Sequence, residues 1–326
     1  MTDLPQLRVE SVRKIYDDGH HNAFTDLCRF KGRIYLTCRS CPDGHMVFTS
    51  SSIVVLVSDD DGATWEKVFS FDAPPDRDTR DPHFLIFRDQ LFVYTGTWLV
   101  PPEGEQRDLN DHLGYAAWTA DGVSWNGPRS LEGTYGHYIW RAAAHGDKAY
   151  LCARRRRDFP PGYDGEDGHK IVEGAMLESD DGLIWRYCTL FTEDYGDETA
   201  FLFEPDGSVL AIARGLGPCT ARVCRSAPPY DAWIRTDLDR NVGGPLLAQW
   251  GDRYLVAGRK SLEPNKPRTT LYWLLDDQLC EIAELPSDGD NSYPGLLPLD
   301  DRRALLSYYS SHEETTSIYL AELELT

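Results

Sequence analysis

Three consecutive aspartates, Asp59 to Asp61, lie in the segment SDDDGATW at positions 58–65. Aspartates in a turn accept hydrogen bonds from nearby backbone N–H groups, and a glycine such as Gly62 permits a positive φ. Trp65 then supplies an aromatic plug at the end of the segment. The pattern predicts a stiff hairpin turn.

Other short motifs give little support for chemistry. Cys38 and Cys41 form a lone CxxC, and without a second pair the spacing does not favour zinc and only weakly supports a redox role. The sequence contains no P-loop, no dinucleotide-binding fingerprint and no HExxH motif. We therefore expect neither a cofactor nor a metal.

The acidic turn recurs along the chain. TADGVSW (119–125) and SDDGLIW (179–185) repeat it one residue shorter, so that Trp65, Trp125 and Trp185 are spaced by 60 residues. SAPPYDAW (226–233) is a fourth version without the acidic turn. Repeats of this length are typical of propellers, solenoids and arrays.

Six hairpins indicate which repeat architecture this is. Each has an apolar strand, a two-residue polar turn and a second apolar strand, which is a strong hairpin signal. The pattern predicts an all-β, six-bladed propeller of four-stranded antiparallel blades, forming a single domain over 1–326. The strand-like segments LRVESVRKIY and SIYLAELEL are expected to pair and close the ring. The inner hairpins are expected at 23–39, 80–98, 138–154, 197–214, 242–259 and 292–310.

Composition limits the partners. The formal net charge of −20 disfavours nucleic acid and anionic lipid, although a small pocket can still be basic. The N-terminus MTDLPQLRVE does not read as a signal peptide, and no apolar run approaches the length of a membrane span. We therefore expect a cytoplasmic protein with reduced cysteines. The sequence does not indicate an oligomeric state.

With these repeats in view, the chain resembles the sialidase-like superfamily (BNR or Asp-box repeat proteins), which includes the bacterial exo-sialidases. Its Asp-box, S-x-D-x-G-x-T-W, is matched by SDDDGATW at every position. In that superfamily the boxes lie on outer blade turns, away from the active site. The resemblance thus implies a structural role for the three aspartates.

The resemblance also implies four site residues on the propeller axis. Sialidases carry a Glu at the start of one inner strand and an Arg at the end of its partner, matched by Glu198 and Arg214. An Arg on the following blade is matched by Arg268, and a Tyr opening the last inner strand by Tyr293. Tyr is the nucleophile in sialidases, and a neighbouring carboxylate can take its proton. The alternative interpretation is that Glu198 and Arg214 form a purely structural ion pair.

The first blade departs from the family pattern. Its inner strand reads NAFTDL, with Ala23 or Phe24 where sialidases have an Arg of the carboxylate-binding triad. Arg39, at the end of the same hairpin, is the candidate to replace that arginine. The family's acid/base Asp lies on the next loop, which here offers Asp43 or His45. His45 suits proton transfer near neutral pH.

Further axial candidates come from the other blades. The segment DTRDPHF offers Arg80, Asp81 and His83, and Arg141 and Arg259 occupy equivalent blade positions.

Two more polar positions are ambiguous. Asp26, on an otherwise apolar strand, either faces the pocket or accepts backbone hydrogen bonds. The arginine run 154–157 reads as a solvated loop edge, from which Arg154 can turn inward.

The sequence favours an exo-glycoside hydrolase that binds a carboxylate-bearing sugar in an axial pocket. Tyr293 would attack, Glu198 would act as its base, and His45 or Asp81 would serve the leaving group. The arginines would grip the carboxylate, because a guanidinium fork binds such groups in a bidentate manner. Two alternatives stay open: a polysaccharide lyase acting on a uronate, and a non-catalytic carbohydrate-binding propeller.

Overall fold

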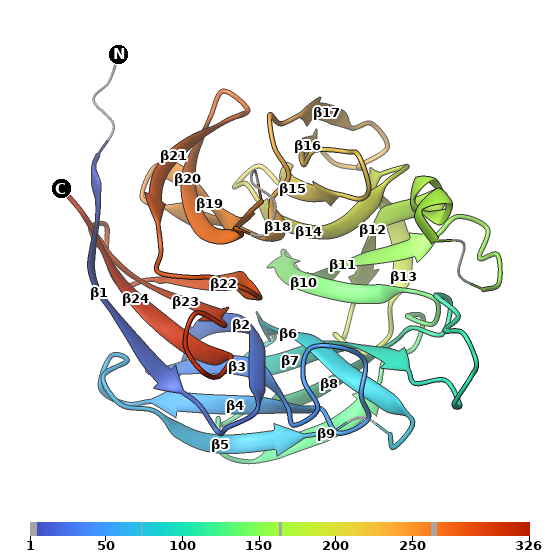
Figure 1. The fold of residues 1–326 in the computed structure, drawn as a ribbon. Helices are drawn as coiled ribbons and strands as arrows, with labels where there is room; N and C mark the ends of the chain where they lie inside the picture. The colour runs from blue at the N-terminus through green and yellow to red at the C-terminus, as the bar shows by residue number, and fades with distance from the viewer. Residues whose placement is uncertain (1–4, 73, 163–164, 262–265) are drawn as a thin grey trace.

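Six four-stranded antiparallel sheets are arranged around a central axis in the computed structural model (Figure 1). The structure describes residues 5–72, 74–162, 165–261 and 266–326. Blade 1 comprises β2 (His21–Phe30), β3 (Arg33–Cys41), β4 (Ser52–Ser58) and β5 (Glu66–Phe71). Blade 2 comprises β6 (Arg77–Phe87), β7 (Gln90–Leu99), β8 (Leu113–Thr119) and β9 (Trp125–Ser130). Blade 3 comprises β10 (Tyr138–His145), β11 (Lys148–Arg156), β12 (Val172–Ser179) and β13 (Arg186–Thr192).

The second half of the chain forms the remaining blades. Blade 4 comprises β14 (Gly196–Phe203), β15 (Val209–Gly215), β16 (Arg222–Ser226) and β17 (Ile234–Asp237). Blade 5 comprises β18 (Gly243–Trp250), β19 (Arg253–Lys260), β20 (Arg268–Leu275) and β21 (Gln278–Glu284). Blade 6 comprises β22 (Asn291–Pro298), β23 (Arg303–Ser310), β24 (Ser317–Leu325) and β1 (Leu7–Tyr16). The predicted propeller and its six inner hairpins are confirmed.

The apolar runs form these strands because the inner and middle strands of a blade are covered on both faces. The segment IYLTC of β3, for example, is buried at every residue, whereas β5 at the blade edge is buried only at Phe71. The hairpin turns also follow the sequence signal. Lys31 and Gly32 both have positive φ, as do Arg88 and Asp89, which is the geometry of the turn that matches strand twist.

The ring closes through strands from the two ends of the chain. β1 pairs antiparallel with β24, from Leu7 opposite Leu325 to Tyr16 opposite Ile318. This pairing places both ends of the described chain at the outer side of blade 6 (Figure 1). The only helix among the described residues is the 3₁₀ helix η1 (Gly165–Ile171). No helix in the described part of the chain is long and apolar enough to span a membrane.

The acidic turn at 58–65 is held by its own side chains. Asp60 accepts hydrogen bonds from Ser58 Oγ at 2.8 Å, from the Thr64 backbone N–H at 2.8 Å and from Thr64 Oγ1 at 2.6 Å. Trp65 Nε1 donates to the Gly62 carbonyl oxygen at 3.0 Å. The turn joins β4 to β5 at the outer side of blade 1. These contacts agree with the structural role implied for Asp59 to Asp61.

Every inner strand has a β-bulge at the same place. In blade 4, for example, Gly196 pairs with Gly215 and Thr199 pairs with Ala213, so Asp197 and Glu198 together oppose one residue, Arg214. A bulge adds one residue to a strand and re-aims its side chains. The six bulges, in blade order, are Phe24–Thr25, Asp81–Pro82, Trp140–Arg141, Asp197–Glu198, Gly244–Pro245 and Tyr293–Pro294.

Candidate active site

Tyr293 and Glu198 meet at the axis, from bulges on blades 6 and 4. The Tyr293 hydroxyl donates a hydrogen bond to Glu198 Oε1 at 2.5 Å, across 95 residues of sequence. Glu198 Oε2 accepts a hydrogen bond from Arg214 at 2.8 Å and one from the Gly244 backbone N–H at 3.1 Å. The same Arg214 nitrogen lies 3.3 Å from the Tyr293 oxygen. The three side chains thus form one hydrogen-bonded cluster.

The charges in this cluster move the pKa values of Glu198 and Tyr293 in opposite directions. Burial opposes ionisation of Glu198, but the charge of Arg214 and the hydrogen bond from Tyr293 outweigh it and hold the pKa of Glu198 at about 2. Burial, followed by the negative charge of Glu198, raises the pKa of Tyr293 well above its usual value. The resting cluster is therefore a neutral phenol bonded to a carboxylate, with Arg214 balancing the charge.

Aromatic neighbours fix the position of the Tyr293 ring. Phe24 packs edge-on against it with ring centroids 4.9 Å apart, and Trp140 contacts it at 6.1 Å. Tyr293 itself has a φ of 49°, in a region that non-glycine residues rarely adopt. Strained backbone of this kind clusters at functional sites.

A second carboxyl group, Asp81, lies on the equivalent bulge of blade 2. It is 4% exposed and accepts a short hydrogen bond from the Tyr138 hydroxyl through Oδ2. Its other oxygen, Oδ1, is buried with no hydrogen-bond partner among the described residues. Burial and then the negative charge of Glu198 raise the pKa of Asp81 to about 6. Two carboxyl groups with pKa values pushed apart in this way are typical of acid–base pairs.

His45 contributes a group with access to the cavity. Its Nδ1 lies 2.7 Å from Asp290 Oδ2, and its Nε2 lies 3.4 Å from a guanidinium nitrogen of Arg80. Asp290 also accepts a hydrogen bond from Tyr309 at 2.8 Å through Oδ1. His45 therefore lies between a carboxylate on its Nδ1 side and a guanidinium on its Nε2 side.

His21, His45 and Asp290 form the group of possible metal ligands found among the described residues, with ligand atoms within 4.8 Å of one another. A metal on His45 Nδ1 would move the ring proton to Nε2, where it would face the Arg80 donors. His21 Nδ1 is buried without a hydrogen-bond partner in this part of the structure, whereas a metal-bound histidine usually donates its second ring N–H. The donor set therefore fits a hydrogen-bonded cluster better than a metal.

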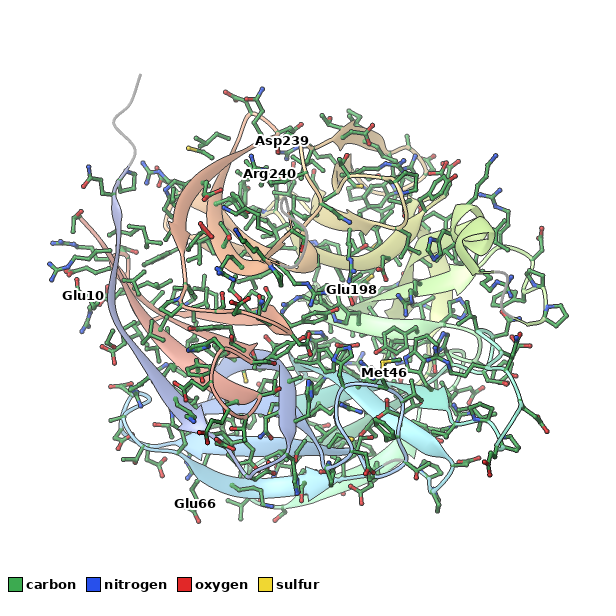
Figure 2. All side chains as sticks on the ribbon, viewed as in Figure 1. Glu10, Met46, Glu66, Glu198, Asp239 and Arg240 are labelled. Atoms are coloured by element: carbon green, nitrogen blue, oxygen red, sulfur yellow. The ribbon has the colours of Figure 1, made fainter. Side chains whose placement is uncertain are left out.

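A cavity of about 240 Å³ opens above the cluster. Figure 2 shows Glu198 near the centre of the ring and Met46 on an adjacent loop. Five arginines line the cavity, which makes it basic within an acidic protein. The lining residues are His45, Met46, Val47, Arg80, Trp98, Arg107, Tyr138, Arg154, Glu198, Arg214, Arg259 and Tyr293.

Several residues expected at the site do line this cavity. Among the expected catalytic residues these are Tyr293, Glu198 and His45, whereas Asp81 lies behind Tyr138. Among the arginines expected to bind substrate, Arg80, Arg214 and Arg259 line it. Arg259 extends from the end of β19 and lies 3.3 Å from Asp290 Oδ1.

Two of the expected arginines are placed elsewhere. Arg39 is fully buried, where it bonds Asp78 at 2.8 Å and the carbonyl oxygens of Gly44 and Met46. Arg268 is at the start of β20 and pairs with Asp288 at 2.9 Å instead of meeting the axial cluster. Neither side chain is among those that line the cavity.

Arg141 and Asp26 lie beneath the cavity instead of lining it. Arg141 donates to the carbonyl oxygens of Pro245 at 3.0 Å and Pro294 at 2.6 Å, so it ties together the bulges of three blades. Asp26 caps the Phe84 backbone N–H at 2.9 Å and lies 3.6 Å from His83. Of the two roles considered for Asp26, the structure favours acceptance of backbone hydrogen bonds.

Besides Met46, Val47, Trp98 and Arg107, which line the cavity, four residues that contact the candidate catalytic groups or their partners were not predicted as site residues. Arg154, expected at a solvated loop edge, turns inward and pairs with Asp197. Asp290 lies beside His45, and the Tyr138 hydroxyl donates a hydrogen bond to Asp81. The Gly244 backbone N–H donates a hydrogen bond to Glu198. The signal for Tyr138 and Gly244 was their place at the start of an inner strand, which is where Tyr293 also lies.

Similar solved structures share this fold. A protein of unknown function from Dyadobacter fermentans superposes with a TM-score of 0.82 and 22% identity, over 99% of this chain and 100% of that one. Trypanosoma rangeli sialidase in complex with the inhibitor DANA gives 0.67 and 14% identity, over 97% of this chain. The K499G mutant of NanB sialidase from Streptococcus pneumoniae gives 0.67 and 13%, over 96% of this chain and 71% of that one.

This chain spans 58% of the Trypanosoma rangeli protein. No protein-family model and no curated relative matches the sequence. The fold of the chain is thus a six-bladed propeller that is similar to the propellers of these sialidases.

Proposed function

We propose that this protein is an exo-glycoside hydrolase that removes a carboxylate-bearing sugar with retention of configuration. The observation that carries the proposal is the hydrogen bond of 2.5 Å between the Tyr293 hydroxyl and Glu198, at the floor of an arginine-lined cavity. A neutral phenol approaches an anionic sugar without the repulsion that a carboxylate nucleophile would meet. The likeness to sialidases supports the same reading at the level of the fold.

In the first step, the Tyr293 oxygen attacks the anomeric carbon and the bond to the leaving group breaks. Glu198 takes the phenolic proton as the new C–O bond forms, and the leaving oxygen takes a proton from the general acid. In the second step, water attacks the glycosyl–tyrosine, and the acid, now deprotonated, accepts a proton from that water. The Tyr293 oxygen regains its proton from Glu198, which restores the enzyme.

Two residues are candidates for the general acid. His45 lines the cavity directly, with Asp290 2.7 Å from its Nδ1. Asp81 has its pKa raised to about 6 and contacts the cavity through Tyr138. Direct access to the cavity favours His45, and a carboxyl pKa raised toward neutral pH favours Asp81.

The arginines around the cluster supply the affinity for the substrate carboxylate. Arg214 and Arg259 approach it from adjacent blades, and Arg80 approaches from the opposite wall. Arginine forks bind carboxylates in a bidentate, oriented manner, so they also fix the position of the anomeric carbon.

The proposal is tested with 4-methylumbelliferyl glycosides of N-acetylneuraminic, glucuronic and galacturonic acids, beside the neutral glucoside. We expect turnover of at least one carboxylated glycoside, no turnover of the neutral one, and a first-formed sugar of unchanged anomeric configuration by NMR. A product with an ultraviolet-absorbing double bond would identify a lyase instead. Absence of turnover together with saturable sugar binding would identify a binding protein.

A further inference from the structure

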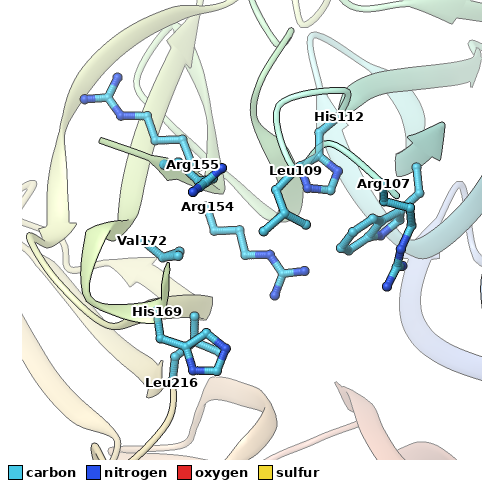
Figure 3. A pocket seen from close by; sticks show the side chains of 10 residues that line it. Arg107, Leu109, His112, Arg154, Arg155, His169, Val172 and Leu216 are labelled. Carbon is cyan, nitrogen blue, oxygen red and sulfur yellow. The ribbon is translucent and has the colours of Figure 1, made fainter. Parts of the chain in front are cut away.

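A second cavity of about 190 Å³ adjoins the axial one on the side of blades 2 to 4 (Figure 3). It is walled by the loop before β8, the end of β11, helix η1 and the start of β12. The lining residues are Trp98, Arg107, Leu109, His112, Arg154, Arg155, Arg156, His169, Val172 and Leu216. The proposed reaction uses none of the residues that belong to this cavity alone.

The two cavities share one wall. Trp98, Arg107 and Arg154 line both of them. The guanidinium carbons of Arg107 and Arg154 lie 4.7 and 5.6 Å from the centre of the Trp98 ring. A molecule extending from the axial cavity would therefore pass along this stack into the second cavity.

The second cavity presents positive charge toward a ligand. Arg155 bonds Glu173 at 2.9 Å through Nε, and Glu173 is 5% exposed. Arg154 similarly pairs with Asp197, which is 1% exposed. The balancing carboxylates thus lie behind the arginines and are not among the residues that line the cavity.

Two polar atoms on its walls lack a hydrogen-bond partner among the described residues. These are Nδ1 of His169 and Nε1 of Trp98, and both are buried. Both atoms have almost no exposed surface, so the arginines are the polar groups that the cavity presents to a ligand.

Apart from His112, the remaining lining is apolar. Leu109, Val172 and Leu216 line the cavity together with the arginines (Figure 3). A wall of this kind suits the C–H face of a sugar ring, while a few convergent polar groups fix its orientation.

We propose that the second cavity binds a second carboxylated pyranose unit, the one released as the leaving group. The substrate class is then an anionic glycan with carboxylates on adjacent sugars. This inference rests on the proposed function and adds to it that the cleaved bond lies between the two cavities. The arginines supply the carboxylate fork, and the apolar lining residues contact the C–H face of the sugar ring.

Isothermal titration of the protein with sodium glucuronate tests the inference without any need for turnover. We expect two binding equivalents in the wild type and no binding of glucose at the same concentrations. Arg155→Gln should weaken one of the two sites by about tenfold, the loss typical of a hydrogen bond to a charged group. Leu109→Trp should fill the second cavity and remove that same site.

Arg157→Gln is the matched control. Arg157 also bonds Glu173, at 3.0 Å, but it is not among the cavity residues. Because Arg155 and Arg157 both contact Glu173, either variant leaves that carboxylate paired. The control should bind two equivalents of glucuronate like the wild type.

Arg259→Gln separates this inference from the proposed function, because it should weaken only the axial site. If a site sensitive to Arg155→Gln is present but none responds to Arg259→Gln, the second cavity stands and the proposed axial site fails. If Arg155→Gln and Leu109→Trp both bind glucuronate like the wild type, the inference is overturned. Absence of saturable glucuronate binding to the wild type overturns it as well.

Discussion

Gly244 lies directly against the ring of Tyr293. A β-carbon placed on Gly244 would lie 2.5 Å from a carbon of that ring, and Gly244 itself has a φ of +57°. Its backbone N–H also donates to Glu198. One glycine on blade 5 therefore permits both members of the pair on blades 4 and 6 to approach each other.

Gly244→Ala is expected to displace Tyr293 and to strain the backbone at a positive φ. Turnover should fall by a factor on the order of 10², because small misplacements of reacting groups have effects of that size. Activity assays and thermal melts of the same preparation check this. Gly251→Ala is the control, since Gly251 has a similar φ of +63° with open space around it. Equal losses of activity in the two variants would refute the positional argument.

Replacement of single arginines by lysine should show which arginines bind the substrate, because only those replacements should raise KM. Arg259→Lys should raise KM about tenfold, because a point charge cannot reproduce a bidentate fork. Arg268→Lys should change KM little, because Arg268 pairs with Asp288 away from the cavity. Steady-state kinetics on both variants give the comparison. A larger effect at position 268 than at 259 would contradict the assignment of the cavity.

The pH dependence distinguishes the two candidate acids. If Asp81 protonates the leaving group, kcat/KM should fall as pH rises through about 6, the raised pKa of that carboxyl. No acidic limb is expected until far lower pH, because the pKa of Glu198 is about 2. Asp81→Asn should remove most of the activity and His45→Gln little. The opposite ranking would assign the acid role to His45.

Asp81 should also affect stability. Its folded-state pKa is raised from the ordinary value of 3.8 to about 6, so the folded protein holds this proton more tightly than the unfolded chain does. The resulting stabilisation is complete below pH 3.8 and is lost as pH rises through 6. Wild-type melting temperature should therefore fall relative to that of Asp81→Asn between these limits. If the melting temperatures of the two proteins change with pH in the same way over this range, the raised pKa of Asp81 is contradicted.

The Asp-box should affect stability and leave chemistry unchanged. Asp60→Ala removes the acceptor of three hydrogen bonds in the turn, and Trp65→Ala removes a half-buried ring. The Trp65 loss should be below the roughly 3–5 kcal/mol typical of a fully buried aromatic side chain. Denaturation midpoints and kcat per folded molecule are the measurements. A variant with a normal midpoint and lost kcat would give the turn a catalytic role.

The hairpins could be predicted because their signal is local. A two-residue turn such as Lys31–Gly32 between apolar runs specifies its own geometry. Tyr293 and Glu198 were also predicted, from the resemblance to sialidases, which carry a Tyr and a Glu at the starts of the corresponding inner strands. Their contact depends on closure of the whole ring, which no local pattern contains.

The arginines show where local reasoning ends. Arg39 and Arg259 occupy the same register on blades 1 and 5, opposite Ala23 and Gly243. Arg39 is nevertheless buried against Asp78 on the next blade, whereas Arg259 lines the cavity. The difference between the two positions comes from the neighbouring blade, which supplies Asp78 as a buried partner for Arg39. The six bulges were likewise not predicted, because one extra residue in a strand leaves no mark in its apolar pattern.

The central claim is that the Tyr293 oxygen forms the bond to the sugar, and the turnover of Tyr293→Phe tests it most directly. The substitution removes the reactive oxygen and keeps the ring packed against Phe24, while Glu198 retains Arg214 and Gly244 as partners. With melting temperature measured on the same sample, we predict a fall in kcat on the order of 10² or more in a folded protein. A folded Tyr293→Phe protein with wild-type kcat would contradict the account.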